Sequence, residues 1–278
     1  MRGTVGGNMR EGEGAQRAPV VVQDGRCGRD GRLSLSALDP GLTEGVGVFE
    51  TLRVRGGEII ALERHLERFY TGVRALSLPG APSEARIRFE LGLAMGELGL
   101  PEAALRFTLT GGGAFWVRAS PAPPPSGPLR VGTAPSRGAP LSHIKHLSRA
   151  PGRWARMAAG VDELIWRAPD GGLLEGTWSN TLALRAGTLW TAPLDGQILP
   201  GTTRAQLLEV ARALGVPCVI AAPVGPFDEL YCCSALRGLV PVATLDGAPL
   251  RGWGPVGRAL AAGLRARWPA GAEAGGAC

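Results

Sequence analysis

The sequence predicts an α+β protein of two domains. Strand-like and helix-like segments alternate without regular βαβ order on both sides of a proline-dense stretch, SPAPPPSGP, at residues 120–128. Proline at this density cannot continue a helix or a central strand, so the stretch is interpreted as an interdomain linker. At 278 residues and 45% hydrophobic content, the chain is large enough for two modest cores. We therefore expect domains at 19–119 and 129–268, a disordered extension at 1–18 and a flexible tail at 269–278.

The first domain is predicted to combine four strands with two helices. The strands are expected at residues 20–22, 47–54, 104–109 and 114–118. The turn Arg55-Gly56-Gly57-Glu58 would fold the second of them back into a hairpin with residues 59–60. The stretch LERHLERFYTGVRAL places apolar side chains at helical spacing. These side chains are Leu62, Leu66, Phe69, Val73 and Leu76. A second helix is expected over residues 83–98, with Ser83 as its N-cap.

The second domain is predicted from shorter apolar runs and three amphipathic stretches. Strands are expected at residues 129–131, 163–166, 182–184 and 218–221. Helices are expected at residues 152–159, 203–214 and 257–267. The segment SHIKHLSR, residues 142–149, then lies near the start of this domain.

Composition excludes several classes of protein. No apolar run approaches the ~20 residues of a membrane span, and the first residues lack the apolar core of a signal peptide, so we expect a cytoplasmic protein without membrane partners. The net charge is +6, but the arginines are scattered and aromatic content is 5%, which argues against nucleic-acid binding. The five cysteines lack paired spacing, so we expect no metal site and no disulfide, and interpret them as buried small hydrophobic residues.

Lys145 is the only lysine among 30 Lys and Arg residues. A guanidinium stays protonated and is no carbonyl nucleophile, whereas a buried amine can lose its proton and condense with an aldehyde. A biased composition that replaced every other lysine would have spared a position where an amine is required. Chance survival of a surface lysine is the alternative, so the surrounding motifs must decide.

Two further motifs fit a lysine that forms a Schiff base with pyridoxal phosphate (PLP). In LLEGTWSN, Glu175 would lie at the end of a buried strand, where a carboxylate can hold the pyridine nitrogen protonated. In LPGTTR, Thr202 and Thr203 open a predicted helix, whose N-terminal N–H groups favour a phosphate. Arg68 could add a cation. Taken singly, a solvated turn glutamate explains Glu175 about equally well, and an ordinary helix cap and a solvated arginine are the better explanations of the threonines and of Arg68.

Taken together, the motifs resemble those of class IV PLP-dependent enzymes. GVGVFETLRV, LERHLERF, the lone lysine, EGTWSN, LPGTTR and SALRGLVPV occur in the order seen in that family, over residues 20–265. The resemblance implies the family's two-domain fold, similar to D-amino acid aminotransferase, with a large PLP-binding domain. It assigns Lys145 as the Schiff-base lysine, Glu175 as the partner of the pyridine nitrogen, and Arg68, Thr202 and Thr203 as phosphate ligands. Ser234 and Ala235 match the late motif and are expected at the cofactor. A homodimer that completes each active site is also implied.

Two segments resemble the 4-amino-4-deoxychorismate lyase branch of the family. IKHLSR is similar to the lyase pattern I-K-H-L-N-R, and CSAL followed by VPV is similar to C-N-A-L…P-V. The resemblance implies a lyase that releases pyruvate and 4-aminobenzoate for folate synthesis, with Lys145 as base. Lys145 or Thr51 could deliver the proton to the departing enolpyruvyl carbon, but a β-branched strand residue without a catalytic role is the better explanation of Thr51. The Arg-Gly-rich segment common in lyases is replaced by TGGGAFW at 110–116, so Arg53 or Arg149 would have to bind the substrate carboxylates. The alternatives are an aminotransferase acting on branched-chain or D-amino acids, and a non-enzymatic binding protein.

Overall fold

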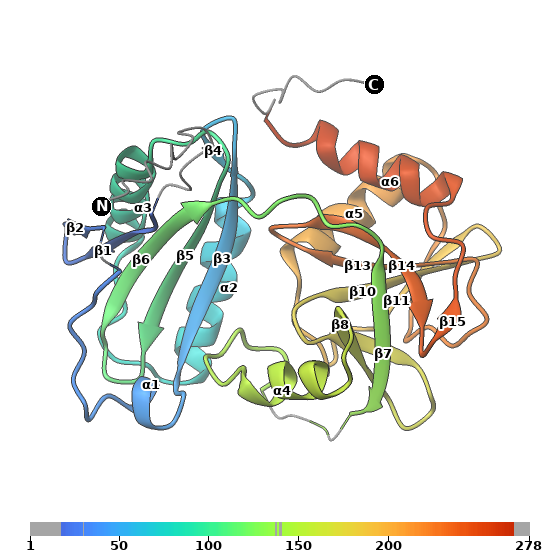
Figure 1. The fold of residues 1–278 in the computed structure, drawn as a ribbon, viewed down its shortest axis with the longest axis horizontal. Coiled ribbons are helices and arrows are strands. Elements are labelled where there is room, and N and C mark those ends of the chain that lie inside the picture. Colours follow the sequence, from blue (N-terminus) through green and yellow to red (C-terminus); the bar gives the residue numbers. More distant parts are fainter. Residues whose placement is uncertain (1–17, 30, 137, 139–140, 270–278) are drawn as a thin grey trace, which may run out of the picture.

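The computed structural model describes residues 18–29, 31–136, 138 and 141–269, which form two β-sheets flanked by helices (Figure 1). The predicted N-terminal extension and C-terminal tail fall outside these residues, apart from residues 18 and 269. The helices and the separate sheets confirm the α+β class. Among the described helices, none combines the length and the apolarity needed to cross a membrane.

The first sheet has six strands in the order β2-β1-β6-β5-β3-β4, with every neighbouring pair antiparallel. Its strands are β1 (Val20–Gln23), β2 (Arg26–Gly28), β3 (Gly47–Arg55), β4 (Glu58–Ile59), β5 (Ala103–Thr110) and β6 (Phe115–Pro121). The helices of this half are α1 (Pro40–Thr43), α2 (Leu62–Ala75) and α3 (Glu84–Leu98). Gly56 and Gly57 both have positive φ in the tight turn from β3 to β4, as the hairpin prediction requires. The Ser83 side chain accepts a hydrogen bond from the Arg86 N–H, which confirms the predicted cap.

Strand β3 has two different faces, and this difference positions the site. Val48, Leu52 and Val54 are buried in the core beneath α2 and α3. Because side chains alternate along a strand, Phe49, Thr51 and Arg53 lie on the opposite face, which is turned toward the second sheet. The Arg53 guanidinium confirms this direction, because it donates to the Leu236 carbonyl oxygen at 2.6 Å.

The second sheet has nine strands and curls until β9 pairs with β10, which closes a ring of six strands. Its strands are β7 (Leu129–Pro135), β8 (Glu163–Arg167), β9 (Leu173–Gly176), β10 (Asn180–Arg185), β11 (Thr188–Thr191), β12 (Cys218–Ile220), β13 (Glu229–Ser234), β14 (Gly238–Leu245) and β15 (Ala248–Pro249). The helices of this half are α4 (Ala150–Ala158), α5 (Thr202–Ala213) and α6 (Pro255–Ala266). Figure 1 shows α4 lying between the two sheets, and the chain from β6 to β7 crossing between them.

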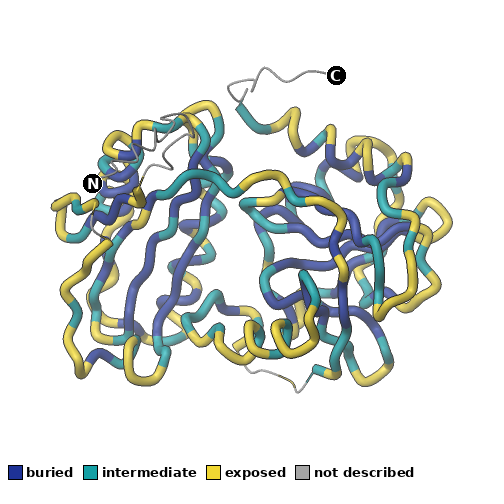
Figure 2. Tube along the Cα trace, in the orientation of Figure 1, coloured by how far each residue is buried: buried dark blue, intermediate teal, exposed yellow. Residues whose placement is uncertain are grey.

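Two cores lie on opposite faces of the second sheet, and Figure 2 shows the buried strands at the centre of each half. Cys233 packs beneath α5 and α6, whereas its neighbour Cys232 faces the interior of the strand ring. The two thiols therefore point to opposite faces, as expected for neighbours on a strand. The interpretation of all cysteines as buried is wrong, because Cys27 and Cys218 are exposed on the edge strands β2 and β12.

Most elements lie within a few residues of the predicted ranges. Helix α1 and strands β2, β11, β13, β14 and β15 were not predicted. Strand β14 contains Pro241, a residue that argues against a strand within a sheet when only the sequence is read. Here Pro241 is paired with Tyr231 of β13. Long-range pairing thus overrides the local signal.

Candidate active site

Lys145 is held against β3 by backbone hydrogen bonds. The Phe49 N–H donates to the Lys145 carbonyl oxygen at 3.0 Å, and the Leu147 N–H donates to the Gly47 carbonyl oxygen at 3.0 Å. The Lys145 ammonium nitrogen lies 4.9 Å from the centroid of the Phe49 ring. The lysine thus belongs to the second half of the chain but rests on a strand of the first sheet, at the junction of the two.

The environment of Lys145 favours the neutral amine. Burial, followed by the charge of Arg68, lowers the pKa of Lys145 to about 7, while Glu50 and Glu175 partly oppose this shift. An ordinary lysine has a pKa near 10.4 and is almost fully protonated at neutral pH. The surroundings therefore supply the amine form that a carbonyl-condensing lysine needs.

Glu175 lies at the end of β9, directly after the buried Leu173 and Leu174, as expected. Its carboxylate accepts hydrogen bonds from the Leu199 N–H at 2.9 Å and from Asn180 Nδ2 at 3.3 Å. Burial raises the pKa of Glu175 to about 7, against the lowering effects of the Leu199 N–H, Arg149 and Lys145. A carboxylate of raised basicity is well suited to share a proton with a ring nitrogen.

Arg68 belongs to a buried network that joins the two sheets. Its Nε and Nη2 donate to the two carboxylate oxygens of Glu50 at 2.8 and 2.6 Å, and its Nη1 donates to the Pro200 carbonyl oxygen at 2.9 Å. Glu50 is fully buried and also lies 2.7 Å from His65 Nδ1. Burial would raise the pKa of Glu50, but Arg68 and His65 outweigh it and lower that pKa to about 2.

The network continues into the N-terminus of α5. Because the ionised Glu50 can only accept, His65 Nδ1 carries the proton and Nε2 is left to accept from Thr202 Oγ1, 3.2 Å away. The Thr202 hydroxyl proton is therefore used within the protein. The solvated alternative for Arg68 does not hold, since its side chain is only 9% exposed.

The first turn of α5 has the properties of an anion site. Its cap residue, Gly201, provides no side chain to satisfy the first N–H groups of the helix. A Cβ at Gly201 would lie 1.7 Å from Asn180 Oδ1, so any other residue would have to displace the Asn180 side chain. Thr203 is 2% exposed, and its buried hydroxyl has no hydrogen-bond partner in the part of the chain that the structure describes. An unsatisfied buried hydroxyl beside free helix N–H groups fits an anionic ligand.

The remaining predicted residues lie on both sides of the same junction. Arg149 precedes α4 and donates to the Thr177 carbonyl oxygen. Arg53 donates to Glu102 at 2.9 Å as well as to Leu236, and its buried Nε has no hydrogen-bond partner among the described residues. Ser234 ends β13, and Ala235 follows it in the turn to β14, the same turn whose Leu236 contacts Arg53.

Thr51 lies on the face of the first sheet that is turned toward the second, beside two arginines that were not assigned a role from the sequence. It pairs in register with Arg106 of β5, which in turn pairs with Arg118 of β6. Directly opposed residues project from the same face of a sheet. Burial, followed by the charges of Arg118 and Arg149, lowers the pKa of Arg106 to about 10, which reflects a crowded group of cations.

Sequence reasoning also missed three polar residues that support the site. Glu50, His65 and Asn180 were each quoted within a motif but given no role. A signal existed for Glu50, since the alternation along its predicted strand places an acid among core-facing residues. Arg106 offered no comparable signal, because its neighbours become visible only when the strands pair.

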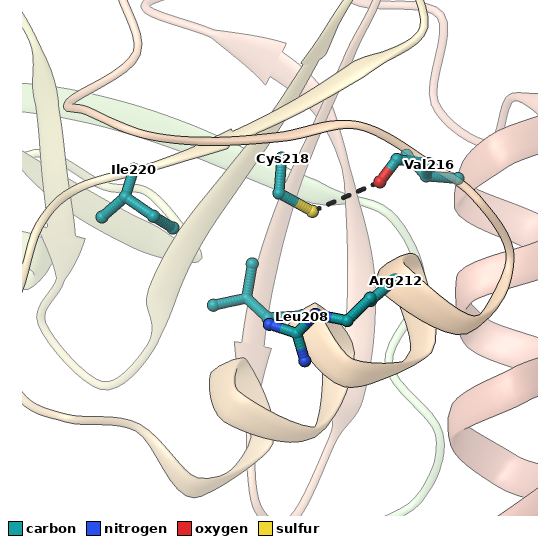
Figure 3. A pocket seen from close by; sticks show the side chains of 5 residues that line it. All are labelled: Leu208, Arg212, Val216, Cys218 and Ile220. Carbon is teal, nitrogen blue, oxygen red and sulfur yellow. Dashed lines mark hydrogen bonds between the residues drawn. The ribbon is translucent and has the colours of Figure 1, made fainter.

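A surface cavity of about 320 Å³ lies at the other end of α5 (Figure 3). It is lined by Leu208, Arg212, Val216, Cys218 and Ile220. None of the predicted site residues borders it. The chemistry-bearing residues therefore gather at the N-terminal end of α5.

Comparisons with known proteins agree with this arrangement. The family model for class IV aminotransferases matches residues 47–245. A protein of Mycobacterium tuberculosis described as a bifunctional aminodeoxychorismate lyase and D-amino acid transaminase is 33% identical over 83% of this chain and 92% of its own length. A putative branched-chain-amino-acid aminotransferase of Methanocaldococcus jannaschii is 28% identical over 77% of this chain and 83% of its own. The PLP-bound form of a hypothetical aminotransferase from M. tuberculosis superposes with a TM-score of 0.80 at 30% identity, covering 90% of this chain and 98% of that one.

The residues present fit that cofactor. The uncapped N-terminus of α5 and the unpartnered Thr203 hydroxyl suit its phosphate, Glu175 suits its ring nitrogen, and the neutral amine of Lys145 suits its aldehyde. These groups come from segments far apart in the sequence and meet at the junction of the two sheets. The chain belongs to the class IV aminotransferase family, whose cofactor is pyridoxal 5′-phosphate.

Proposed function

We propose that the protein is a 4-amino-4-deoxychorismate lyase that releases pyruvate and 4-aminobenzoate for folate synthesis. The observation that carries the proposal is a group of three cations, Arg106, Arg118 and Arg149. Of these, Arg149 acts electrostatically on Lys145, and Arg106 contacts the same Phe49 ring as Lys145. Aminodeoxychorismate carries two carboxylates, and arginine is the side chain best matched to such groups. The expected Arg-Gly segment is absent at residues 110–116, where β5 leads into β6. Arg106 and Arg118 come from these two strands.

In this proposal each residue has one task. PLP, when bound, withdraws electrons from the substrate carbon that bears the amino group. Lys145 Nζ removes the proton from that carbon, and the C–O bond of the enolpyruvyl ether breaks so that the ring becomes aromatic. Lys145 or Thr51 then delivers a proton to the departing enolpyruvyl carbon, which yields pyruvate. Glu175 keeps the cofactor ring protonated.

The same proposal assigns binding tasks to the remaining predicted residues. Arg68, Thr203 and the N–H groups of Thr202 and Thr203 bind the cofactor phosphate, and Ser234 and Ala235 border the cofactor. Arg149 and Arg53 bind substrate together with Arg106. Two nitrogens of Arg53 also contact Leu236 and Glu102 at the junction between the two halves.

The overall organisation is part of the proposal as well. We propose a cytoplasmic homodimer with a small domain at 19–119 and a PLP-binding domain at 129–268. Residues 120–128 would act as the linker. Its path is supported by the Arg237 guanidinium, which donates to the Ser126 hydroxyl from the turn between β13 and β14.

The second candidate is an aminotransferase acting on D-amino or branched-chain amino acids. Relatives described as aminotransferases of each kind support it. One is the putative branched-chain-amino-acid aminotransferase, and another is the M. tuberculosis protein whose description combines lyase and D-amino acid transaminase. Proton removal at the amino carbon is common to both reactions. The two activities then differ in what the site does next: it either expels an ether oxygen or returns a proton to the cofactor.

A product assay separates the candidates. Purified protein is loaded with PLP and supplied with aminodeoxychorismate, and 4-aminobenzoate and pyruvate are measured by chromatography. The same preparation is supplied with D-alanine or L-leucine and a 2-oxo acid. The lyase proposal expects equimolar 4-aminobenzoate and pyruvate, and a Lys145→Ala variant that forms neither. Transamination without either product would overturn it and favour the second candidate.

A further inference from the structure

Glu163 is a fully buried carboxylate on β8 that lies beneath the turn at residues 176–179, which directly follows Glu175. Its Oε1 accepts from the Leu164 N–H at 2.9 Å, the Thr177 N–H at 2.9 Å and the Thr177 hydroxyl at 2.6 Å. Its Oε2 accepts from the Trp178 N–H at 3.1 Å and the Ser179 hydroxyl at 2.7 Å. One side chain therefore accepts from four donors of residues 177–179.

These five donors are backbone N–H groups and hydroxyls, and none of them is a cation. Burial accordingly raises the pKa of Glu163, in spite of the hydrogen bonds from Thr177 and Ser179. A buried carboxylate is costly unless its hydrogen bonds are complete. Gly176 lets the turn approach it closely, since a Cβ at that position would lie 2.4 Å from Glu163 Oε2.

The turn held by Glu163 connects groups of the active site. Glu175 precedes it, Asn180 follows it, and these two residues are partners where β9 pairs with β10. The Thr177 carbonyl oxygen within the turn accepts from Arg149. A shift of the turn would therefore move the ring anchor and an arginine of the proposed substrate site together.

We propose that Glu163 is a positioning residue for the cofactor: it fixes the turn at residues 176–179 so that Glu175 meets the pyridine nitrogen. The inference rests on the proposed role of Glu175 but not on the identity of the substrate. The charge of Glu163 is one of the influences that raise the pKa of Glu175, after the larger effect of burial. The Glu163 carboxylate thus makes Glu175 a better proton acceptor.

A purely structural role for Glu163 makes a different prediction. If the residue only stabilised the fold, its replacement would lower the melting temperature and leave the affinity for PLP unchanged. If it positions Glu175, replacement also weakens PLP binding and changes the absorption spectrum of the bound cofactor. Binding and spectrum therefore distinguish the two roles without any activity measurement.

The test uses Glu163→Gln, which keeps the shape but replaces one acceptor oxygen by a donor that faces the Trp178 N–H. The matched control is Glu229→Gln, another buried acid, which accepts from Tyr231 Oη and the Gly257 N–H at the start of α6. Apparent Kd values for PLP are measured by titrating cofactor-free protein and following the cofactor absorbance. We expect Glu163→Gln to raise this Kd on the order of tenfold, which corresponds to one lost buried hydrogen bond, while the control stays within about twofold of wild type.

A double-mutant cycle with Glu175→Gln shows whether the effect passes through Glu175. If Glu163 acts through Glu175, adding Glu163→Gln to Glu175→Gln changes the Kd for PLP less than about twofold further. Fully multiplicative effects, or a single variant with wild-type Kd and spectrum, would overturn the inference. A Glu175→Gln variant that binds PLP with unchanged Kd and spectrum would instead remove the proposed ring anchor, and the inference with it.

If Glu163→Gln does not fold, Thr177→Val and Thr177→Ser take its place. Thr177→Val removes the hydroxyl that donates to Glu163 at 2.6 Å, and Thr177→Ser keeps it. The inference expects a weaker affinity for PLP in Thr177→Val and a near wild-type affinity in Thr177→Ser. Equal affinities in the two variants would overturn it.

Discussion

Replacing Glu50 by glutamine is expected to cost the cofactor-free protein about 3 kcal/mol of unfolding free energy at pH 6. The pKa of Glu50 falls from its ordinary 4.5 to about 2 in the folded state. At 1.36 kcal/mol for each unit, this shift corresponds to roughly 3 kcal/mol. The physical cause is that glutamine leaves Arg68 and His65 without the carboxylate that both of them contact.

The same reasoning determines how the difference in unfolding free energy between the wild type and Glu50→Gln depends on pH. Because the folded-state pKa is lowered, the stabilisation is complete above about 4.5 and is lost as the pH falls toward 2. Protonated Glu50 is neutral like glutamine, so the variant and the wild type should converge at low pH. Urea unfolding at pH 6 and pH 3 measures this, with roughly half of the difference remaining at pH 3.

The control is Glu90→Gln, which alters another buried acid, whose partner Arg86 is 38% exposed. A half-exposed partner can be hydrated when the acid is lost, so we expect a loss of about 1 kcal/mol. A Glu50→Gln loss no larger than that of the control, or a loss equal at pH 6 and pH 3, would refute the electrostatic account of the network.

Three further predictions test the site itself. The rate at which cofactor-free protein captures PLP should rise with pH up to about 7 and then level off, because only the neutral amine of Lys145 reacts. Stopped-flow absorbance between pH 5 and 9 measures this rate. A rate that still rises at pH 9 would contradict the lowered pKa of Lys145. Gly201→Ala should prevent tight PLP binding in a titration, because the new Cβ would overlap Asn180 Oδ1, whereas Gly92→Ala, where the helix has open space, should bind normally. Arg106→Gln should raise KM about tenfold for a dicarboxylate substrate and less for a monocarboxylate amino acid. Steady-state assays measure both KM values, and equal increases would show that Arg106 does not bind the second carboxylate.

The local elements of this protein could be predicted from the sequence because their causes are local. Apolar spacing marked α2, the paired glycines at 56 and 57 marked the turn after β3, and Ser83 marked the start of α3. The chemistry could also be predicted, because a single lysine retained among arginines indicates a role that a guanidinium cannot fill. The family followed from the order of short motifs, which needs no tertiary contact.

What the sequence by itself determined is therefore the five longer helices, the turn from β3 to β4 and the identity of the reactive groups. Only the tertiary structure decided which distant groups meet: His65 with the start of α5, Arg106 with Arg118, and Glu163 with the turn after Glu175. These contacts join segments whose separation in the sequence carries no periodic signal. They depend on strand register and on the closure of the second sheet, which many weak contacts settle together rather than any one residue.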